Sequence, residues 1–114
     1  MSEFNMITGP INSVIDELKR DISSYQRKRE KIKIGISVIP ETRWAKHSLS
    51  QHEWDKMVVL YKSSSHDSIC LAESMLIEYS KSKFTDKCQN INGGGSGIND
   101  PYLYKEFYLY ILLK

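Results

Sequence analysis

The sequence predicts an α/β domain in which one small sheet of three strands is flanked by three helices. Two patterns carry this prediction: apolar residues recur every three or four positions in three segments, and they alternate or cluster over short runs in three others. A chain of 114 residues is long enough for one domain with a modest core and too short for two. We therefore expect a single domain over residues 1–114.

Helical spacing marks residues 10–30, a short segment that begins at Pro40, and residues 67–82. Proline is tolerated in the first turn of a helix, where its missing N–H has no helical partner to lose, so Thr8-Gly9-Pro10 can start the first helix. Residues 1–30 are therefore expected to form a basic amphipathic helix at the N-terminus. The apolar stripe of this helix comprises Ile11, Val14, Ile15, Leu18, Ile22 and Tyr25.

Strand patterns mark residues 31–37, 57–62 and 107–113. In the first of these segments the isoleucines share one face, and the other face carries Lys33, Gly35 and Ser37. Polar residues on a strand face that helices cover are either buried or line a cleft. This face is therefore a place to look for function.

Two classes of protein are excluded by composition. No apolar run approaches the roughly 18 residues that a membrane crossing needs, and the first residues lack the basic and apolar stretches of a secretory signal. We expect an intracellular protein, cytoplasmic or nuclear. Cys70 and Cys88 are too few for a disulfide framework and show no zinc-ligand spacing with the histidines, so both are expected to be reduced thiols.

The net charge of +2 hides an uneven distribution of charge along the chain. Residues 19–46 hold nine of the 16 Lys and Arg residues against three acids, which leaves the rest of the chain acidic. A protein that neutralises phosphates concentrates its cations in this way, although a solvated helix face gives the same pattern. The candidate nucleic-acid contacts are Arg27, Lys28, Arg29, Lys31 and Lys46.

Glu73 is the most informative single residue. It falls within the apolar stripe of the third helix, formed by Ile69, Ala72, Leu76 and Ile77, rather than opposite it. An ionised carboxylate in such a register costs several kcal/mol unless it is paired or coordinated. The glutamate therefore indicates a metal ion, a catalytic cleft or a structural salt bridge.

Two further groups of residues are suited to phosphate binding or proton transfer. Arg43 and His47 lie four positions apart on one helix face, a spacing that lets both approach a phosphate, although a surface helix carries such a pair by chance as well. Lys33 would lower the pKa of Tyr108 or Tyr110 if their strands are neighbours. Strand tyrosines with hydroxyls in water are the alternative.

The segment 90–97 is rich in glycine. It lacks the Gly-Lys-Ser/Thr ending of a nucleotide-binding loop, so we expect a flexible connection rather than a phosphate site. Asn90 and Asn92 suit a tight turn or the orientation of a nearby group.

Taken in order, these residues resemble the GIY-YIG endonuclease family over roughly residues 31–98. The resemblance implies a small, mainly antiparallel three-stranded sheet flanked by helices, one divalent metal ion held by a helix glutamate, and hydrolysis of DNA. The matching pieces are Lys33-Ile34-Gly35-Ile36-Ser37, Arg43-x-x-x-His47, Leu71-Ala72-Glu73-Ser74-Met75-Leu76-Ile77, and Cys88-Gln89-Asn90 with the glycines that follow.

Two departures from that family concern its tyrosines. The second motif begins with Lys33 in place of a tyrosine, and no Gly-Ile-Tyr strand precedes it, because residues 10–30 are expected to be helical. The segment Tyr108-Leu109-Tyr110-Ile111 resembles the missing strand, as in a circularly permuted and degenerate relative. In that arrangement Tyr110 takes the place of the first-motif tyrosine.

The resemblance implies a role for each matching residue. Tyr110, assisted by Lys33, acts as general base with His47 as the competitor for that role, and Arg43 clamps the scissile phosphate. Glu73 holds one Mg2+ or Mn2+ ion, and the downstream asparagine orients the groups beside it. The implied catalytic residues are Lys33, Arg43, His47, Glu73, Asn90 and Tyr110.

Two other functions stay open at this point. One is a catalytically inactive nucleic-acid-binding module of the same fold, which the lysine at position 33 favours. The other is a protein-interaction domain whose basic first helix binds an acidic partner. The expected partner is nucleic acid, DNA ahead of RNA, and not a membrane.

Overall fold

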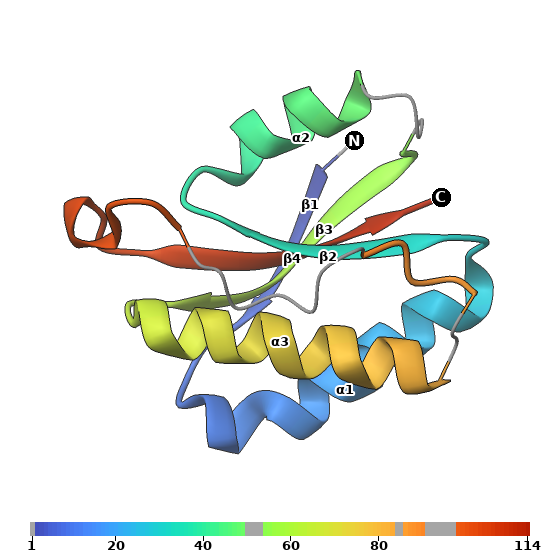
Figure 1. Ribbon diagram of the computed structural model, residues 1–114, viewed down its shortest axis with the longest axis horizontal. Coiled ribbons are helices and arrows are strands. Elements are labelled where there is room, and N and C mark those ends of the chain that lie inside the picture. The colour runs from blue at the N-terminus through green and yellow to red at the C-terminus, as the bar shows by residue number, and fades with distance from the viewer. Residues whose placement is uncertain (1, 50–53, 84–85, 91–97) are drawn as a thin grey trace.

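The computed structural model describes residues 2–49, 54–83, 86–90 and 98–114. Within these ranges the chain forms four strands, three α-helices and one turn of 3-10 helix (Figure 1). The glycine-rich segment 91–97, including Asn92, lies outside the described residues. The elements are β1 (Ser2–Ile7), α1 (Ile11–Lys28), β2 (Ile32–Ser37), α2 (Pro40–Ser48), β3 (Lys56–Ser63), α3 (His66–Lys83), η1 (Pro101–Leu103) and β4 (Phe107–Leu113).

The sheet has four strands, in the order β1-β3-β4-β2, which corrects the predicted three-stranded sheet for the part of the chain described here. β1 is parallel to β3 and the other two pairs are antiparallel, so the sheet is mixed. β1 also corrects the expectation that residues 1–30 form only a helix. The sequence of β1 shows no alternation of buried and exposed residues, because Phe4 and Met6 stay exposed at the sheet edge. The position of β1 is determined by its pairing with the buried strand β3.

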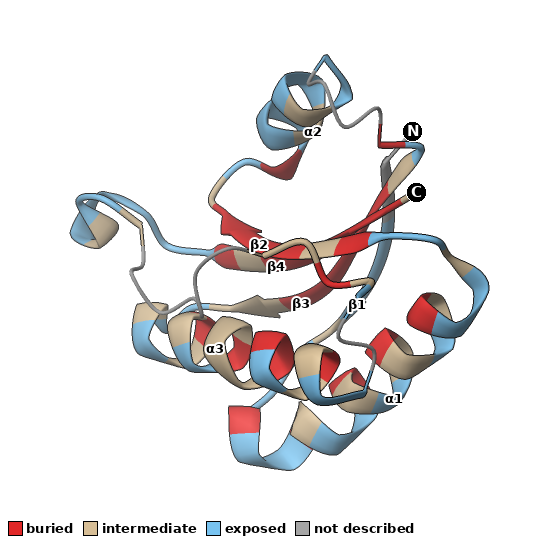
Figure 2. Ribbon diagram, turned by 45° about the vertical axis from the view of Figure 1, so that its right-hand side comes forward, coloured by how far each residue is buried: buried red, intermediate tan, exposed pale blue. Residues whose placement is uncertain are grey.

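α1 and α3 cover one face of the sheet, and α2 covers the other (Figures 1 and 2). The larger core lies between the sheet and the first two of these helices. The stripe predicted for α3 is buried, and so is most of the stripe predicted for α1, where Ile15 and Tyr25 are only partly buried. The periodicity of both helices therefore predicts their buried faces correctly.

A smaller apolar cluster lies on the face that α2 covers. Its buried members are Trp54, Met57, Val59, Tyr110 and Leu112. Trp44 of α2 and Tyr108 of β4 pack against it. This face thus combines a thin apolar layer with a buried tyrosine.

Two predictions from composition concern the state of the cysteines and the presence of membrane-spanning helices. Cys70 and Cys88 are both free thiols, as expected. Across the described ranges, no helix combines the length and apolarity that a membrane crossing requires.

Candidate active site

Tyr110 and His47 form the centre of the candidate site. Tyr110 lies in the middle of β4 and is only 4% exposed, and its hydroxyl oxygen lies 3.0 Å from Nε2 of His47 on α2. The cross-strand partner of Tyr110 is Gly35 of β2, where a Cβ atom would collide with the phenol ring and hydroxyl. Glycine at this position leaves the space that the tyrosine side chain occupies.

Burial of Tyr110 raises the pKa of its phenol to about 12, because the phenolate would lose its hydration. The Arg43 guanidinium lowers this pKa and the Glu73 carboxylate raises it, so both charges act on one phenol. The expectation of a lowered pKa for Tyr110 is therefore wrong, because burial outweighs the effect of a nearby cation. The cation that opposes burial is Arg43, and Lys33 is half-buried two positions before Gly35 in β2.

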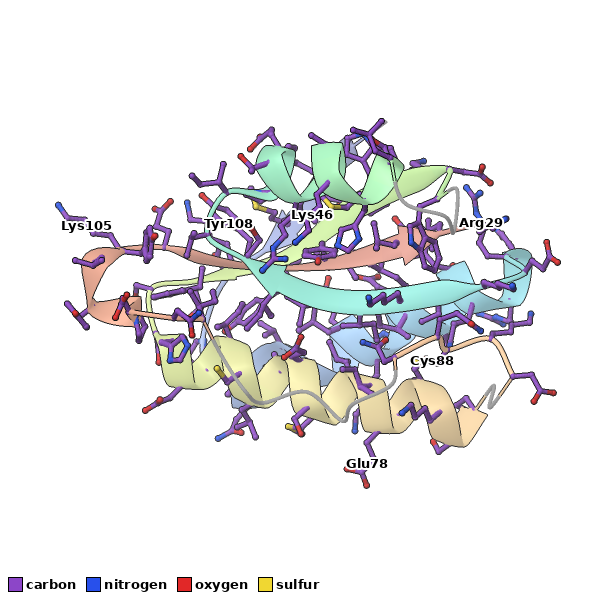
Figure 3. The ribbon with its side chains drawn as sticks, turned by 45° about the horizontal axis from the view of Figure 1, so that its top comes forward. Arg29, Lys46, Glu78, Cys88, Lys105 and Tyr108 are labelled. Carbon is purple, nitrogen blue, oxygen red and sulfur yellow. The ribbon has the colours of Figure 1, made fainter. Side chains whose placement is uncertain are left out.

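Arg43 and Glu73 act on the phenol from helices on opposite faces of the sheet. Arg43 is exposed on α2, and Glu73 is half-buried on α3 within the predicted apolar stripe. β2 is the edge strand beside β4, and the two helices lie on either side of it (Figure 3). The candidate site is therefore at the β2 edge of the sheet, beside Gly35.

Asn90 closes this edge of the sheet. Its Oδ1 accepts the backbone N–H of Ile34 at 2.9 Å, and its Nδ2 donates to the carbonyl of Ile34 at 2.7 Å. Just before it, the N–H of Ile32 donates to Lys87 and the carbonyl of Ile32 accepts the N–H of Gln89, both at 2.8 Å. The side-chain amide takes the place of a neighbouring strand and satisfies the outward-facing backbone groups of β2.

A groove of about 350 Å³ lies between the end of β2 and α2. Its two cations and two hydroxyl groups suit a phosphate ligand. Arg43 and Lys46 are expected from the sequence to bind phosphate, whereas Thr42 is not, although it lies four positions before Lys46 on the same helix face. The lining residues are Ser37, Val38, Ile39, Thr42, Arg43 and Lys46.

The five basic residues expected to contact nucleic acid fall into two groups. Lys46 lines the groove. Arg27 and Lys28 end α1, and Arg29 and Lys31 lie between α1 and β2, where Nη1 of Arg29 is 3.9 Å from Oδ2 of Asp55. Figure 3 shows Arg29 and Lys46 well apart. The structure therefore brings Lys46 to the site and leaves the other four as a separate basic surface.

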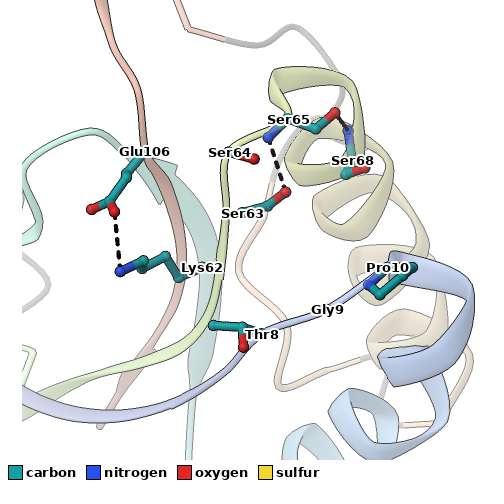
Figure 4. Close-up of a pocket in the computed structure, with 9 residues that line it drawn as sticks. All are labelled: Thr8, Gly9, Pro10, Lys62, Ser63, Ser64, Ser65, Ser68 and Glu106. Atoms are coloured by element: carbon teal, nitrogen blue, oxygen red, sulfur yellow. Dashed lines mark hydrogen bonds and ion pairs between the residues drawn. The ribbon is translucent and has the colours of Figure 1, made fainter.

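A larger cavity, of about 430 Å³, lies where α1 and α3 begin (Figure 4). Its charged side chains are already paired: Nζ of Lys62 is 3.2 Å from Oε1 of Glu106, and the hydroxyl of Tyr108 donates to Oε2 at 2.9 Å. The Ser65 hydroxyl accepts the N–H of Ser68 at 3.2 Å and so caps α3. The lining of this cavity includes none of the predicted catalytic residues, so we locate the candidate site at Tyr110 and His47.

The chemistry of the donor groups limits how a metal ion could bind. Among the described residues, no three or more His, Cys, Asp and Glu side chains form a metal-binding cluster. Glu73 is a single carboxylate whose charge acts on Tyr110. Mg2+ keeps several water ligands and binds through one or two carboxylates plus substrate phosphates, so one glutamate fits such an ion when nucleic acid supplies further oxygen atoms.

Comparisons of this chain with protein-family models, with curated proteins and with solved structures find no match.

Proposed function

We propose that this protein is a metal-dependent endonuclease that hydrolyses phosphodiester bonds of nucleic acid, with DNA as the expected substrate and one Mg2+ or Mn2+ ion as cofactor. One observation carries the proposal: Tyr110 is hydrogen-bonded to His47, and the charges of Arg43 and Glu73 both act on its phenol. A base, a cation and a carboxylate are the groups that phosphodiester hydrolysis uses. The resemblance of the ordered motifs to GIY-YIG endonucleases supports the same assignment.

Tyr110 and His47 act together as the general base. With a pKa of about 12, the phenol of Tyr110 holds its proton at neutral pH and cannot by itself take one from water. Nε2 of His47, 3.0 Å away, accepts the phenol proton as the phenol oxygen takes one from the attacking water. Arg43 favours this transfer because its charge stabilises the phenolate.

The remaining residues bind and position the substrate. Arg43 binds the scissile phosphate through its planar guanidinium, and Lys46 binds a neighbouring phosphate in the same groove. Glu73 holds the metal ion, which when bound stabilises the negative charge that develops on the phosphate. Lys33 adds a cation on the face of β2 that carries Gly35, and Asn90 is a positioning residue that acts through β2.

The test is a cleavage assay of plasmid DNA in Mg2+ or Mn2+ with a matched pair of variants on α3. Glu73→Gln removes the carboxylate whose charge acts on Tyr110 and is expected to lower the cleavage rate about 100-fold or more. Glu78→Gln changes an exposed glutamate that points away from the sheet (Figure 3) and is expected to keep the wild-type rate. Equal rates for the Glu73 variant and the wild type would exclude the metal assignment. An inert wild-type protein would exclude the endonuclease.

A second candidate function is a catalytically inactive nucleic-acid-binding module. The raised pKa of Tyr110 favours it, because a phenol that resists deprotonation is a weak base catalyst. This candidate predicts binding that weakens steeply with salt and no cleavage in the presence of metal.

A further inference from the structure

The segment just before β4 projects beyond the end of the sheet (Figure 1). Its turn, η1, and the residue after it present three consecutive large side chains to solvent. Tyr102 is 81% exposed, Leu103 is 64% exposed and Tyr104 is 41% exposed. A contiguous group of exposed large side chains marks an interaction surface, whereas single exposed apolar residues are ordinary.

Local backbone geometry holds this turn in one shape. Asp100 has a φ of 52°, a left-handed conformation that is uncommon for a residue other than glycine, and Pro101 then fixes the first residue of η1. The N–H groups of Leu103 and Tyr104 donate to the carbonyls of Asp100 and Pro101 at 3.0 and 3.1 Å. The exposed rings are thus presented by an ordered turn, which lowers the entropy cost of binding.

The turn lies at the same end of the sheet as the phosphate groove. Tyr108, in the first part of β4, pairs with Ser37, which ends β2 and lines the groove. Phe107, where β4 begins, is about 10 Å along the strand from Tyr110.

We infer that Tyr102 and Tyr104 stack on unpaired nucleobases of the substrate while its phosphates lie in the groove of Arg43 and Lys46. This inference rests on the proposed function and names its substrate class: single-stranded nucleic acid, or a duplex with an unpaired segment. Bases in an intact duplex stack on one another, and unpaired bases offer a free π-face to an exposed aromatic side chain. Lys105, exposed beside the turn, adds a cation for the backbone of the same strand.

The test measures binding of a fluorescent single strand, and of the same strand in a perfect duplex, to the full chain without divalent metal. We expect the single strand to bind more tightly than the duplex. Tyr102→Ala and Tyr104→Ala should each weaken single-strand binding about 5- to 150-fold, and Tyr102→Phe and Tyr104→Phe should retain it because the ring is kept. Phe4→Ala, which removes an exposed ring from β1 at the opposite sheet edge, is the matched control and should leave binding unchanged.

Each result separates the inference from the proposed function. Single-strand affinity that survives both tyrosine-to-alanine changes, in a protein that still cleaves DNA, overturns the inference and leaves the endonuclease standing. Equal losses for alanine and phenylalanine variants overturn stacking as the mode of binding. A protein that binds neither strand nor duplex overturns the inference, and the cleavage assay in Mg2+ or Mn2+ then decides on the endonuclease separately.

Discussion

The face of the sheet under α1 and α3 differs from the face under α2 in the amount of apolar surface and in the polar groups that it holds. The first face carries the larger core, whose buried polar pair, Gln26 and Ser80, is hydrogen-bonded between the two helices. The second carries a thin cluster of five buried residues, and one of them is Tyr110, hydrogen-bonded to His47. The first face therefore holds most of the apolar core, and the second holds the Tyr110–His47 pair of the candidate site.

The largest expected effect comes from the first face. Leu76→Ala opens a cavity in the larger core and should lower the free energy of unfolding by about 2 to 5 kcal/mol. Trp44→Ala, on the half-buried side of α2, should cost clearly less. Urea denaturation of both variants measures the difference. Equal losses would show that the two faces contribute alike to stability.

The pH dependence of the free energy of unfolding depends on the second face, through the ionisation of Tyr110. Because burial raises the pKa of Tyr110 to about 12, its ionisation opposes folding. The stabilisation from the neutral phenol is fully present below the unfolded pKa of about 10 and is lost as pH rises to about 12, a change of about 2 to 3 kcal/mol. Tyr110→Phe should remove this part of the alkaline loss. Denaturation curves at several alkaline pH values measure it, and a Tyr110→Phe protein with the wild-type pH profile would contradict it.

The contrast between the faces also explains what the sequence could predict. The buried stripe of α3 and the shared face of the three isoleucines of β2 follow from local periodicity, which the chain carries by itself. β1 escapes that reasoning because an edge strand with exposed Phe4 and Met6 is defined by its pairing with β3. Elements with a buried face of their own, including the edge strand β2, are therefore predictable, and β1, with its exposed Phe4 and Met6, is not.

The residues of the candidate site can be singled out from the sequence, but the geometry that joins them cannot. Glu73, Arg43 and His47 follow from their helical positions. The hydrogen bond between His47 and Tyr110 joins residues 63 positions apart and depends on how α2 packs over the register of β2 and β4. The direction of the pKa shift of Tyr110 depends on the same packing, since burial is its largest cause, and so the sequence pattern alone gave the wrong sign.

Gly35→Ala tests whether the second face tolerates any change beside the phenol. The added methyl group collides with the ring of Tyr110, and relief of that overlap should cost about 1 to 3 kcal/mol of unfolding free energy. It should also displace the hydroxyl from His47 and reduce cleavage. Wild-type stability and activity in the Gly35 variant would mean that Tyr110 has room to move.

Asn90→Ala has the smallest expected effect on stability and separates the edge of the sheet from its two faces. The variant loses two hydrogen bonds to the backbone of Ile34, each worth about 0.5 to 1.5 kcal/mol, and water can replace part of them at this half-buried edge. Asn90→Asp should do no better at neutral pH, because a carboxylate keeps the acceptor for the N–H of Ile34 but places negative charge against its carbonyl oxygen. Hydrogen exchange at the Ile34 amide should be faster in Asn90→Ala, while Asn99→Ala, at an exposed asparagine, should leave it unchanged. If the Ile34 amide stays protected in Asn90→Ala, the backbone bonds of Lys87 and Gln89 to Ile32 hold the edge, and any loss of cleavage must then come from Asn90 itself.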